Sequence, residues 1–352
     1  MDTVEKNELV KIGKALIALA GGNLSDPQNV DVAPYHNGNG NGQNGAMATA
    51  SIGHVKGWLP DEVDNRDFTL DPKYLKKLNT PKAKLMAEAL IHNNKTLKLK
   101  SSPPSSVDLR GFCSQIENQG SIGSCTAQAV VGLIEYYARR RNDFDFDGSR
   151  LFLYKVTRRL DNFVGDTGAH IRTTLRAATS IGVPPETYWP YSDGADVWDE
   201  TPDNFAYALA DNHRASSYFR FDPAGGTGST SQLLTSLKKS IASDMPFAFG
   251  FNVYGSIWRT PAGSGHIPFP RDGENMEGGH AVMAVGYDNG KKITHPDTGI
   301  TTTGAVLIRN SWGTEWGEAG YGWLPYDYIT SGHARDFWSI LDMDWLATQD
   351  FN

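Results

Sequence analysis

The chain has 352 residues, of which 39% are hydrophobic and 21% are charged, the composition of an ordinary globular protein with a substantial core. Its formal net charge is −7 and no basic stripe runs along it, so we do not expect nucleic acid as a partner. No uncharged apolar run reaches the length of about 18 residues that a membrane-spanning helix requires, so we expect no membrane span.

The cysteines and the first residues bear on the compartment. The two cysteines, Cys113 and Cys125, exclude a disulfide framework and a structural zinc site built mainly from cysteines, although one bridge between them is permitted. Asp2, Glu5 and Glu8 stand where a secretory signal carries net positive charge. We therefore expect the protein in the cytoplasm by default. A protein exported without a signal peptide would show the same features at its N-terminus.

The first hundred residues differ in texture from the rest. Residues 9–20 predict a short helix, and the tract at residues 23–53, rich in Asn and Gly, predicts a flexible linker because it cannot bury apolar surface. Alternating charges around Trp58, in a stretch flanked by prolines, are typical of an extended strap in which Trp58 is the anchor. Residues 81–93 carry leucine and methionine at helical spacing, which predicts a second short helix.

Beyond residue 107 the patterns are first helical and then extended. Thr126–Arg139 contains no proline and places apolar residues on one face, so it predicts a buried helix with Cys125 at its N-terminal end. A second helix is predicted at His170–Ser180. Short runs rich in β-branched and aromatic residues predict strands at Pro246–Phe251, Ala281–Tyr287, Ala305–Arg309 and Gly320–Leu324.

Helices followed by strands indicate an α+β protein with a cleft between two lobes. The run at residues 101–106, which contains two prolines, predicts the boundary between an N-terminal segment at residues 1–100 and a globular domain at residues 101–352. Within that domain we place a helical lobe at about residues 111–205 and a β lobe at about residues 206–352.

Three short segments carry residues that can act together in thiol chemistry: Gln119–Thr126, Gly278–Val282 and Arg309–Gly313. A thiol attacks a carbonyl as the thiolate, so a nucleophilic cysteine needs a neighbour that lowers its pKa. A helix N-terminus and an imidazolium both do so. Cys125 has the predicted helix after it and glycines before it, which let the chain turn sharply and keep the sulfur within reach.

The residues around this thiol have complementary roles. His280 would take the thiol proton and later return it to the leaving amine. Asn310 would bond to the other imidazole nitrogen and hold the tautomer and orientation of the ring without adding charge. Gln119 would present its side-chain amide to the oxyanion, beside the backbone N–H of Cys125. An inert buried thiol is the plain alternative for Cys125, and it is outweighed because the partners stand in order inside their motifs.

In this chain order, the Gln, Cys, His and Asn resemble those of the papain-like cysteine proteases. Further similarity covers Val107–Arg110, Gly182–Tyr191, Gly286–Tyr287 and Gly313–Tyr321, and extends over about residues 105–325. The resemblance implies a papain-like two-lobed fold with the active site in the cleft, thiol-dependent endopeptidase activity, and no metal or organic cofactor.

The chain departs from the family pattern near the nucleophile. Ile122 stands where the family usually has a second, disulfide-bonded cysteine, and Thr126 stands where an aromatic residue usually follows the nucleophile. Neither change removes a catalytic group. Without this bridge, we expect a fold that keeps its cysteines reduced or does not depend on a disulfide. In this respect the chain is similar to disulfide-poor bacterial members such as xylellain. Cys113 lies in no motif and is interpreted as a structural thiol.

Three further residues are assigned to substrate binding: Gly168, Gly279 and Trp312. Gly168 lies where the family's glycine-rich wall pairs with substrate backbone, and a simple turn is an equal alternative. Gly279 directly precedes the histidine of its motif. The indole of Trp312, beside Asn310, would shield the Asn–His hydrogen bond from water, and plain core packing is the alternative.

We therefore expect a monomeric cysteine endopeptidase that acts on peptide or protein substrates through an acyl-enzyme on Cys125. In the family an N-terminal propeptide commonly blocks the cleft, so the strap around Trp58 is interpreted as the inhibitory segment of a zymogen. A folded accessory segment that stabilises the lobes is the alternative. Two other functions stay open: a transferase or ligase that passes the acyl group to an amine, and a catalytically silent binding protein on the same scaffold.

Overall fold

A computed structural model gives the structure of the chain at residues 57–62, 64, 67–69, 102–142, 145–194, 197–222 and 229–343. All of these belong to one compact unit, Ala50–Asn352. The helices predicted at residues 9–20 and 81–93 and the linker predicted at residues 23–53 lie outside the described residues, and the predicted domain boundaries stay predictions.

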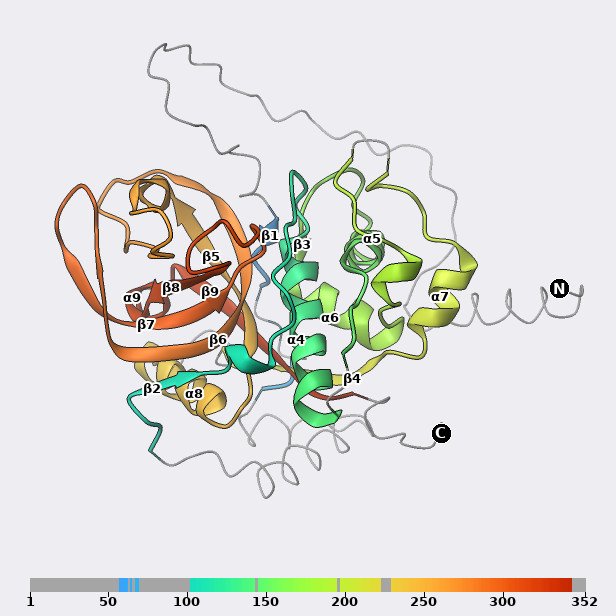
Figure 1. The fold of residues 1–352 in the computed structure, drawn as a ribbon, viewed down its shortest axis with the longest axis horizontal. Helices are drawn as coiled ribbons and strands as arrows, with labels where there is room; N and C mark the ends of the chain where they lie inside the picture. The colour runs from blue at the N-terminus through green and yellow to red at the C-terminus, as the bar shows by residue number, and fades with distance from the viewer. Residues whose placement is uncertain are drawn as a thin grey trace, which may run out of the picture. The chain divides into compact units, whose positions relative to one another are not determined.

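Helices gather on one side of this unit, around a long buried helix (Figure 1). This helix, α4, spans Cys125–Asn142, and its Ala, Val, Leu and Ile side chains are almost fully buried. It packs against the helices α5 (Arg150–Leu160) and α6 (Ile171–Ser180), and the short helix α7 spans Asn204–Ala210. The prediction of a buried helix that begins at Cys125 is confirmed, as is the helix that ends at residue 180.

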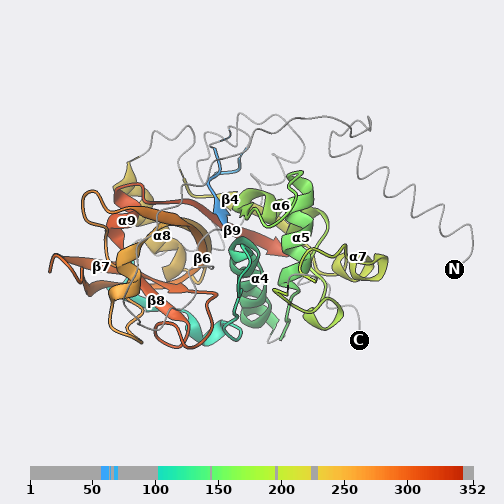
Figure 2. The same cartoon turned by 90° about the horizontal axis from the view of Figure 1, so that it is seen from above.

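An antiparallel sheet forms the other side (Figure 1, Figure 2). Among the described residues it has seven strands, in the order β4-β9-β5-β6-β7-β8, with β2 paired to β6. The strands are β2 (Ser106–Asp108), β4 (Ala215–Arg220), β5 (Phe247–Tyr254), β6 (Met276–Thr294), β7 (Thr301–Arg309), β8 (Tyr321–Pro325) and β9 (Ala334–Met343).

The strands predicted from sequence correspond to β5, β6, β7 and β8, and each observed strand extends further than predicted at one end or both. Two predictions, at Pro246 and Gly320, begin one residue before the strand does. Buried phenylalanines on β5, among them Phe247, Phe249 and Phe251, pack into the core of this lobe. Helices also occur here, because α8 (Thr230–Ala242) packs on β6 and α9 (Tyr326–Thr330) packs on β7. The expected α+β, two-lobed fold is confirmed.

The two lobes meet where α4 packs against β6. This contact brings the first turn of α4 next to the middle of the sheet. A separate two-stranded sheet lies on the helical lobe, where β1 (Trp58–Leu59) pairs in parallel with β3 (Ala169–His170). The extended strap predicted around Trp58 therefore contains a short strand paired to β3.

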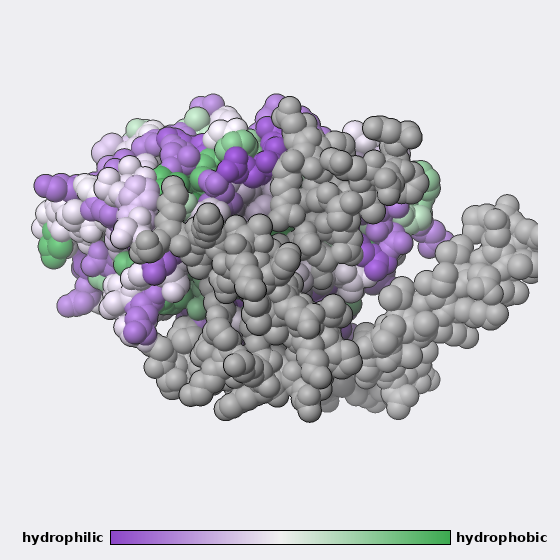
Figure 3. All heavy atoms as spheres, turned by 90° about the horizontal axis from the view of Figure 1, so that it is seen from below, coloured by the Kyte–Doolittle hydropathy of each residue, from purple (hydrophilic) through white to green (hydrophobic). Residues whose placement is uncertain are grey.

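No helix in the described part of the chain is both long and apolar enough to cross a membrane. On the face shown in Figure 3, hydrophilic residues cover most of the described surface, and hydrophobic residues form small separate spots.

Candidate active site

The sulfur of Cys125 lies at the contact between the two lobes. Cys125 is the first residue of α4, and its Sγ accepts a hydrogen bond of 3.4 Å from the backbone N–H of Ala281 on β6. The side chain is fully buried. This burial raises the pKa of the Cys125 thiol to about 12, against the opposing donation from Ala281. The thiolate is therefore strongly disfavoured in this state.

His280 and Asn310 meet as the sequence predicts. His280 lies on β6, and Asn310 follows the last residue of β7. Nε2 of His280 is 2.7 Å from Oδ1 of Asn310, and the same oxygen accepts from the backbone N–H of Ser311 at 2.8 Å. Because the carboxamide oxygen accepts both bonds, Nε2 carries the proton in the neutral ring, and Nδ1 is the nitrogen that can take one up.

Trp312 covers the imidazole. Its indole stacks on the ring of His280 with centroids 4.6 Å apart and planes inclined by 24°. Trp258 stacks in turn on Trp312 at 5.3 Å, and Trp316 meets Trp312 edge to face. The buried Trp312 therefore does more than fill the core, since its ring lies directly against the predicted base.

Gln119 is held at both ends of its side-chain amide. Its Oε1 accepts from the hydroxyl of Ser311 at 2.7 Å, and its Nε2 donates to the carbonyl of Ile122 at 3.0 Å. The backbone N–H of Gln119 also donates to the carbonyl of Ser311 at 2.8 Å. These bonds link the turn before Cys125 to the segment that carries Asn310.

Asp166, which the sequence did not single out as a site residue, supports the same turn. Its carboxylate accepts from the backbone N–H of Gly123 at 2.9 Å and from the hydroxyl of Tyr154 at 2.5 Å. The hydroxyl of Tyr154 in turn accepts from the backbone N–H of Gly168 at 3.1 Å. Its position two residues before Gly168 could have drawn attention to Asp166. That stretch was considered only for hydrogen bonds to the substrate backbone.

The strap, by which we mean residues 57–62, 64 and 67–69, passes directly against the thiol. The N–H of Gly57 donates to the carbonyl of Gly279 at 3.3 Å, and the carbonyl of Gly57 accepts from the N–H of Ala169 at 2.8 Å. A Cβ on Gly57 would lie only 2.6 Å from Sγ of Cys125. Only glycine fits at this position without moving the sulfur or the strap.

Trp58 anchors the strap, as predicted. Its side chain is only 4% exposed, its ring lies so close to Gly250 and Gly279 that a Cβ at either position would overlap it, and its Nε1 donates to Asp336 at 3.2 Å. The carbonyl of Gly57 similarly lies where a Cβ on Gly168 would be, at 2.6 Å. The two glycines assigned to substrate binding, at positions 168 and 279, therefore both contact the strap.

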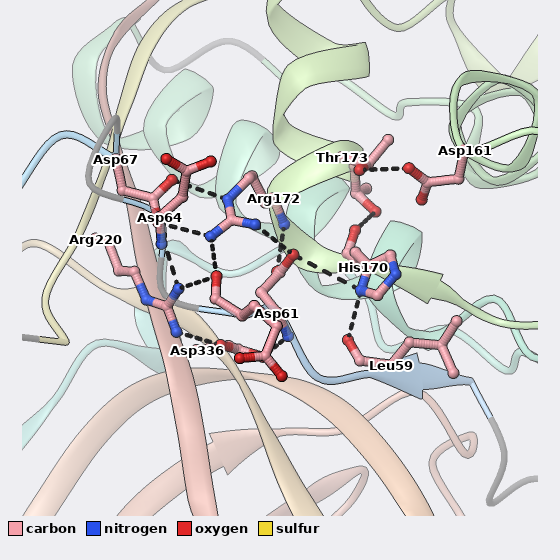
Figure 4. A network of polar contacts seen from close by, with 12 residues as sticks. Leu59, Asp61, Asp64, Asp67, Asp161, His170, Arg172, Thr173, Arg220 and Asp336 are labelled. Atoms are coloured by element: carbon pink, nitrogen blue, oxygen red, sulfur yellow. Dashed lines mark hydrogen bonds and ion pairs between the residues drawn. The ribbon is translucent and has the colours of Figure 1, made fainter. Parts of the chain in front are cut away.

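Beyond Trp58, acidic residues of the strap bind two arginines of the helical and β lobes (Figure 4). The Asp61 carboxylate accepts from the backbone N–H of Arg172 at 3.0 Å and from its guanidinium at 3.2 Å. Asp67 pairs with the same guanidinium at 2.6 Å. The backbone N–H of Asp61 donates to Asp336 at 2.8 Å, and Asp336 is paired with Arg220. Sequence reasoning missed this cluster because its members come from remote segments with no shared motif.

The structure leaves both cysteines free. Cys113 is buried away from Cys125, and its sulfur lies 3.8 Å from the carbonyl of Leu109. Burial raises the pKa of its thiol. These observations agree with its interpretation as a structural thiol.

Comparisons with known proteins agree with this geometry. The family model described as papain family cysteine protease matches residues 103–335. An uncharacterized peptidase C1-like protein of Acanthamoeba polyphaga mimivirus is 30% identical over 305 residues, which cover 84% of this chain and 90% of that protein. Cathepsin K of Gallus gallus is 26% identical over 226 residues, which cover 63% of this chain and 58% of that protein.

Among solved structures, xylellain, a cysteine protease from Xylella fastidiosa, is 30% identical and superposes with a TM-score of 0.63. The match covers 84% of this chain and 98% of xylellain. The family model spans most of the two lobes, and the predicted cysteine, histidine and asparagine converge where those lobes meet. The chain therefore belongs to the papain family of cysteine proteases and is a cysteine peptidase.

Proposed function

We propose that the chain is a cysteine endopeptidase made in a latent form, in which the strap blocks the cleft until it is displaced. The observation that carries the proposal is the position of Gly57, whose backbone lies against Sγ of Cys125 and is bonded to both walls, at Gly279 and Ala169. A peptide substrate needs the same space and the same backbone partners.

With the strap displaced, the buried groups provide each step of peptide hydrolysis. The Cys125 thiolate, stabilised by the start of α4 and by protonated His280, attacks the peptide carbonyl carbon and forms a C–S bond. The side-chain N–H of Gln119 and the backbone N–H of Cys125 stabilise the oxyanion. His280 then protonates the leaving amine as the C–N bond breaks.

The remaining acyl-enzyme is released by water. His280, now neutral, takes a proton from the water molecule, whose oxygen attacks the thioester carbon. The C–S bond breaks, the acid product leaves, and the proton returns to the Cys125–His280 pair. Asn310 keeps the ring in one tautomer throughout, and Trp312 keeps water from the Asn310–His280 hydrogen bond.

Two features favour the strap as an inhibitor over a substrate. The carbonyl of Gly57 is engaged by the backbone N–H of Ala169, a donor on the wall of the cleft that is not one of the oxyanion donors. In addition, burial raises the pKa of Cys125 to about 12, so the nucleophile stays protonated while the strap is in place. Latency then has a steric and an electrostatic part.

The test compares hydrolysis of a fluorogenic peptide by the full chain and by its Gly57→Ala variant. A Cβ at this position cannot coexist with the docked strap, and overpacking of this kind costs about 1–3 kcal/mol, so we expect activity to rise about tenfold. The matched control is Gly111→Ala, because a Cβ on Gly111 meets no atom within 4 Å.

The Cys125→Ala variant, alone and combined with Gly57→Ala, should show no hydrolysis. If Gly57→Ala remains folded and its activity equals that of the parent chain, the strap is not inhibitory. If activity persists without the thiol, Cys125 is not the nucleophile.

A further inference from the structure

The strap also makes specific contacts at a distance from Cys125. Gly57 lies at the sulfur, Trp58 and Leu59 pair with β3, and Asp61 reaches the start of α6. This path follows one wall of the cleft through backbone hydrogen bonds. A substrate that replaces the strap on this wall therefore brings one of its own side chains to the place of Asp61.

That place is built to hold a carboxylate. Asp61 accepts from the backbone N–H of Arg172 at 3.0 Å and from its guanidinium at 3.2 Å, and Nδ1 of His170 lies 3.6 Å from the same carboxylate. Arg172 is the second residue of α6, where the partial positive charge of the helix N-terminus adds to that of the guanidinium.

The two arginines of this region differ in where their partners come from, and Figure 4 shows both beside the strap. Among the described residues, the hydrogen-bonding partners of the Arg172 guanidinium are Asp61, Asp67 and the carbonyl of Glu62, and all three belong to the strap. Arg220 instead keeps acidic partners outside the strap, at positions 222 and 336.

Displacement of the strap therefore leaves Arg172, whose side chain is only 25% exposed, without its carboxylates beside an open cleft. A partly buried guanidinium without acceptors is unfavourable, and an incoming carboxylate would restore its charge-assisted hydrogen bonds. Arg220 offers no such gain, because its own lobe already supplies its carboxylates.

We propose that Arg172 is a specificity-determining residue that makes the opened cleft prefer substrates with an aspartate or glutamate on the acyl side, several residues from the scissile bond. The inference rests on the proposed function, because it takes the strap as the occupant of the substrate cleft. The predicted ligand is an acidic peptide, bound at Arg172 and at the start of α6.

The experiment uses the full chain with Gly57→Ala, in which the strap no longer fits. A series of fluorogenic peptides carries one aspartate moved stepwise along the acyl side, and a second series carries asparagine at the same positions. The same sequences, made as peptidyl chloromethyl ketones, report the rate of alkylation at Cys125 by mass spectrometry. Both series are also run on Arg172→Gln and on Arg176→Gln, which removes a positive charge from the same helix one turn away.

We expect one position at which aspartate exceeds asparagine about tenfold in kcat/KM and in alkylation rate, as one charge-assisted hydrogen bond predicts. The preference should fall below about twofold in Arg172→Gln and persist in Arg176→Gln, and Arg172→Glu should favour lysine at that position. No preference at any position, or one that survives Arg172→Gln, overturns the inference. If the ketones show the preference but no peptide is hydrolysed, the inference stands and the proposed peptidase activity fails.

Discussion

At the scale of single residues, the hydrogen bonds around the imidazole of His280 determine which ring nitrogen takes up and releases a proton. Asn310 accepts from Nε2 of His280 and also from the backbone N–H of Ser311, so its oxygen cannot be exchanged for its amide nitrogen without losing both bonds. The ring is thereby oriented before any substrate arrives. Trp312, stacked on it, restricts the ring further.

Gln119 offers the sharpest test at this scale. In the Gly57→Ala chain, Gln119→Ala should lower kcat by about 10²–10³-fold, because one oxyanion donor is lost. The rate at which iodoacetamide alkylates Cys125 should change little, because that reaction forms no oxyanion. Gln115→Ala, which truncates an exposed side chain, is the matched control. Equal losses in hydrolysis and in alkylation would show that Gln119 only supports the fold of the turn.

The sequence predicts these groups because each lies in a short contiguous motif whose chemistry is readable in isolation. Gln119, Cys125, His280 and Asn310 were all found in this way. Arg172 and Asp336 were not, since each takes its meaning from a partner on the strap, and nothing in the residues around either of them points to that partner.

At the scale of elements, the strap contains the two-residue strand β1 and is held by side chains as well as by short backbone contacts. Its backbone pairs with β3, bonds to β6 through Gly57 and meets β4 through a bridge between Thr69 and Arg220. The buried Trp58 and the carboxylates of Asp61 and Asp67 add side-chain contacts. The displacement proposed above therefore breaks short backbone contacts and side-chain contacts, and not a long strand ladder.

Removal of one charge should therefore loosen the strap. Asp61→Asn keeps the size of the side chain but loses the charge-assisted bonds to Arg172, which are worth about 1.5–3 kcal/mol. We expect the otherwise unchanged chain to hydrolyse a neutral fluorogenic peptide about tenfold faster. Glu62→Gln is the control, because the side chain of Glu62 is exposed and only its carbonyl contacts Arg172. If both variants behave alike, the Asp61 contact does not hold the strap.

The elements that sequence patterns predicted well are those with a clear period or a clear apolar run. α4 carries the helical period and β5 the apolar run, and both elements are almost fully buried. The helix α5 was not predicted, although the sequence carries a start signal for it. That signal is Ser149, whose hydroxyl accepts from the backbone N–H of Phe152 as an N-cap. The pairing of β1 with β3 was beyond prediction, since two-residue strands carry no period.

At the scale of the whole molecule, a buried ion pair joins the central helix to its neighbour. Glu135 of α4 and Arg150 of α5 are 2.7 Å apart, with side chains 0% and 2% exposed. Glu135→Gln would leave the buried guanidinium without its main partner, which costs about 3–5 kcal/mol of unfolding free energy. Glu117, also near Arg150 but 33% exposed, provides the control.

Denaturant unfolding of the two variants checks this expectation. Glu117→Gln should cost less than about 1 kcal/mol, because solvent screens that pair. A loss for Glu135→Gln no larger than that of the control would mean that Asp147, which lies 3.0 Å from the Arg150 guanidinium, balances its charge without Glu135. The sequence could not reveal this pair, because both residues look like ordinary surface charges on amphipathic helices.

The convergence of the lobes is likewise a property of the whole fold. The chain order of the motifs indicated the family, but the meeting of α4 with β6 is what brings the sulfur of Cys125 to Ala281, the residue after His280. The central claim is that the strap closes this meeting point and keeps the thiol protonated. Burial raises the pKa of the Cys125 thiol to about 12, so the closed form is stabilised while this thiol is protonated. The stabilisation is lost as pH rises toward that value.

The most direct measurement is the pH dependence of alkylation at Cys125, followed by mass spectrometry from about pH 5 to about pH 10 for the full chain and for Gly57→Ala. The closed chain should react slowly, with a rate that still rises at the alkaline limit. The opened variant should reach its plateau near or below neutral pH, because the start of α4 and His280 then stabilise the thiolate. Identical profiles for the two chains would contradict the account.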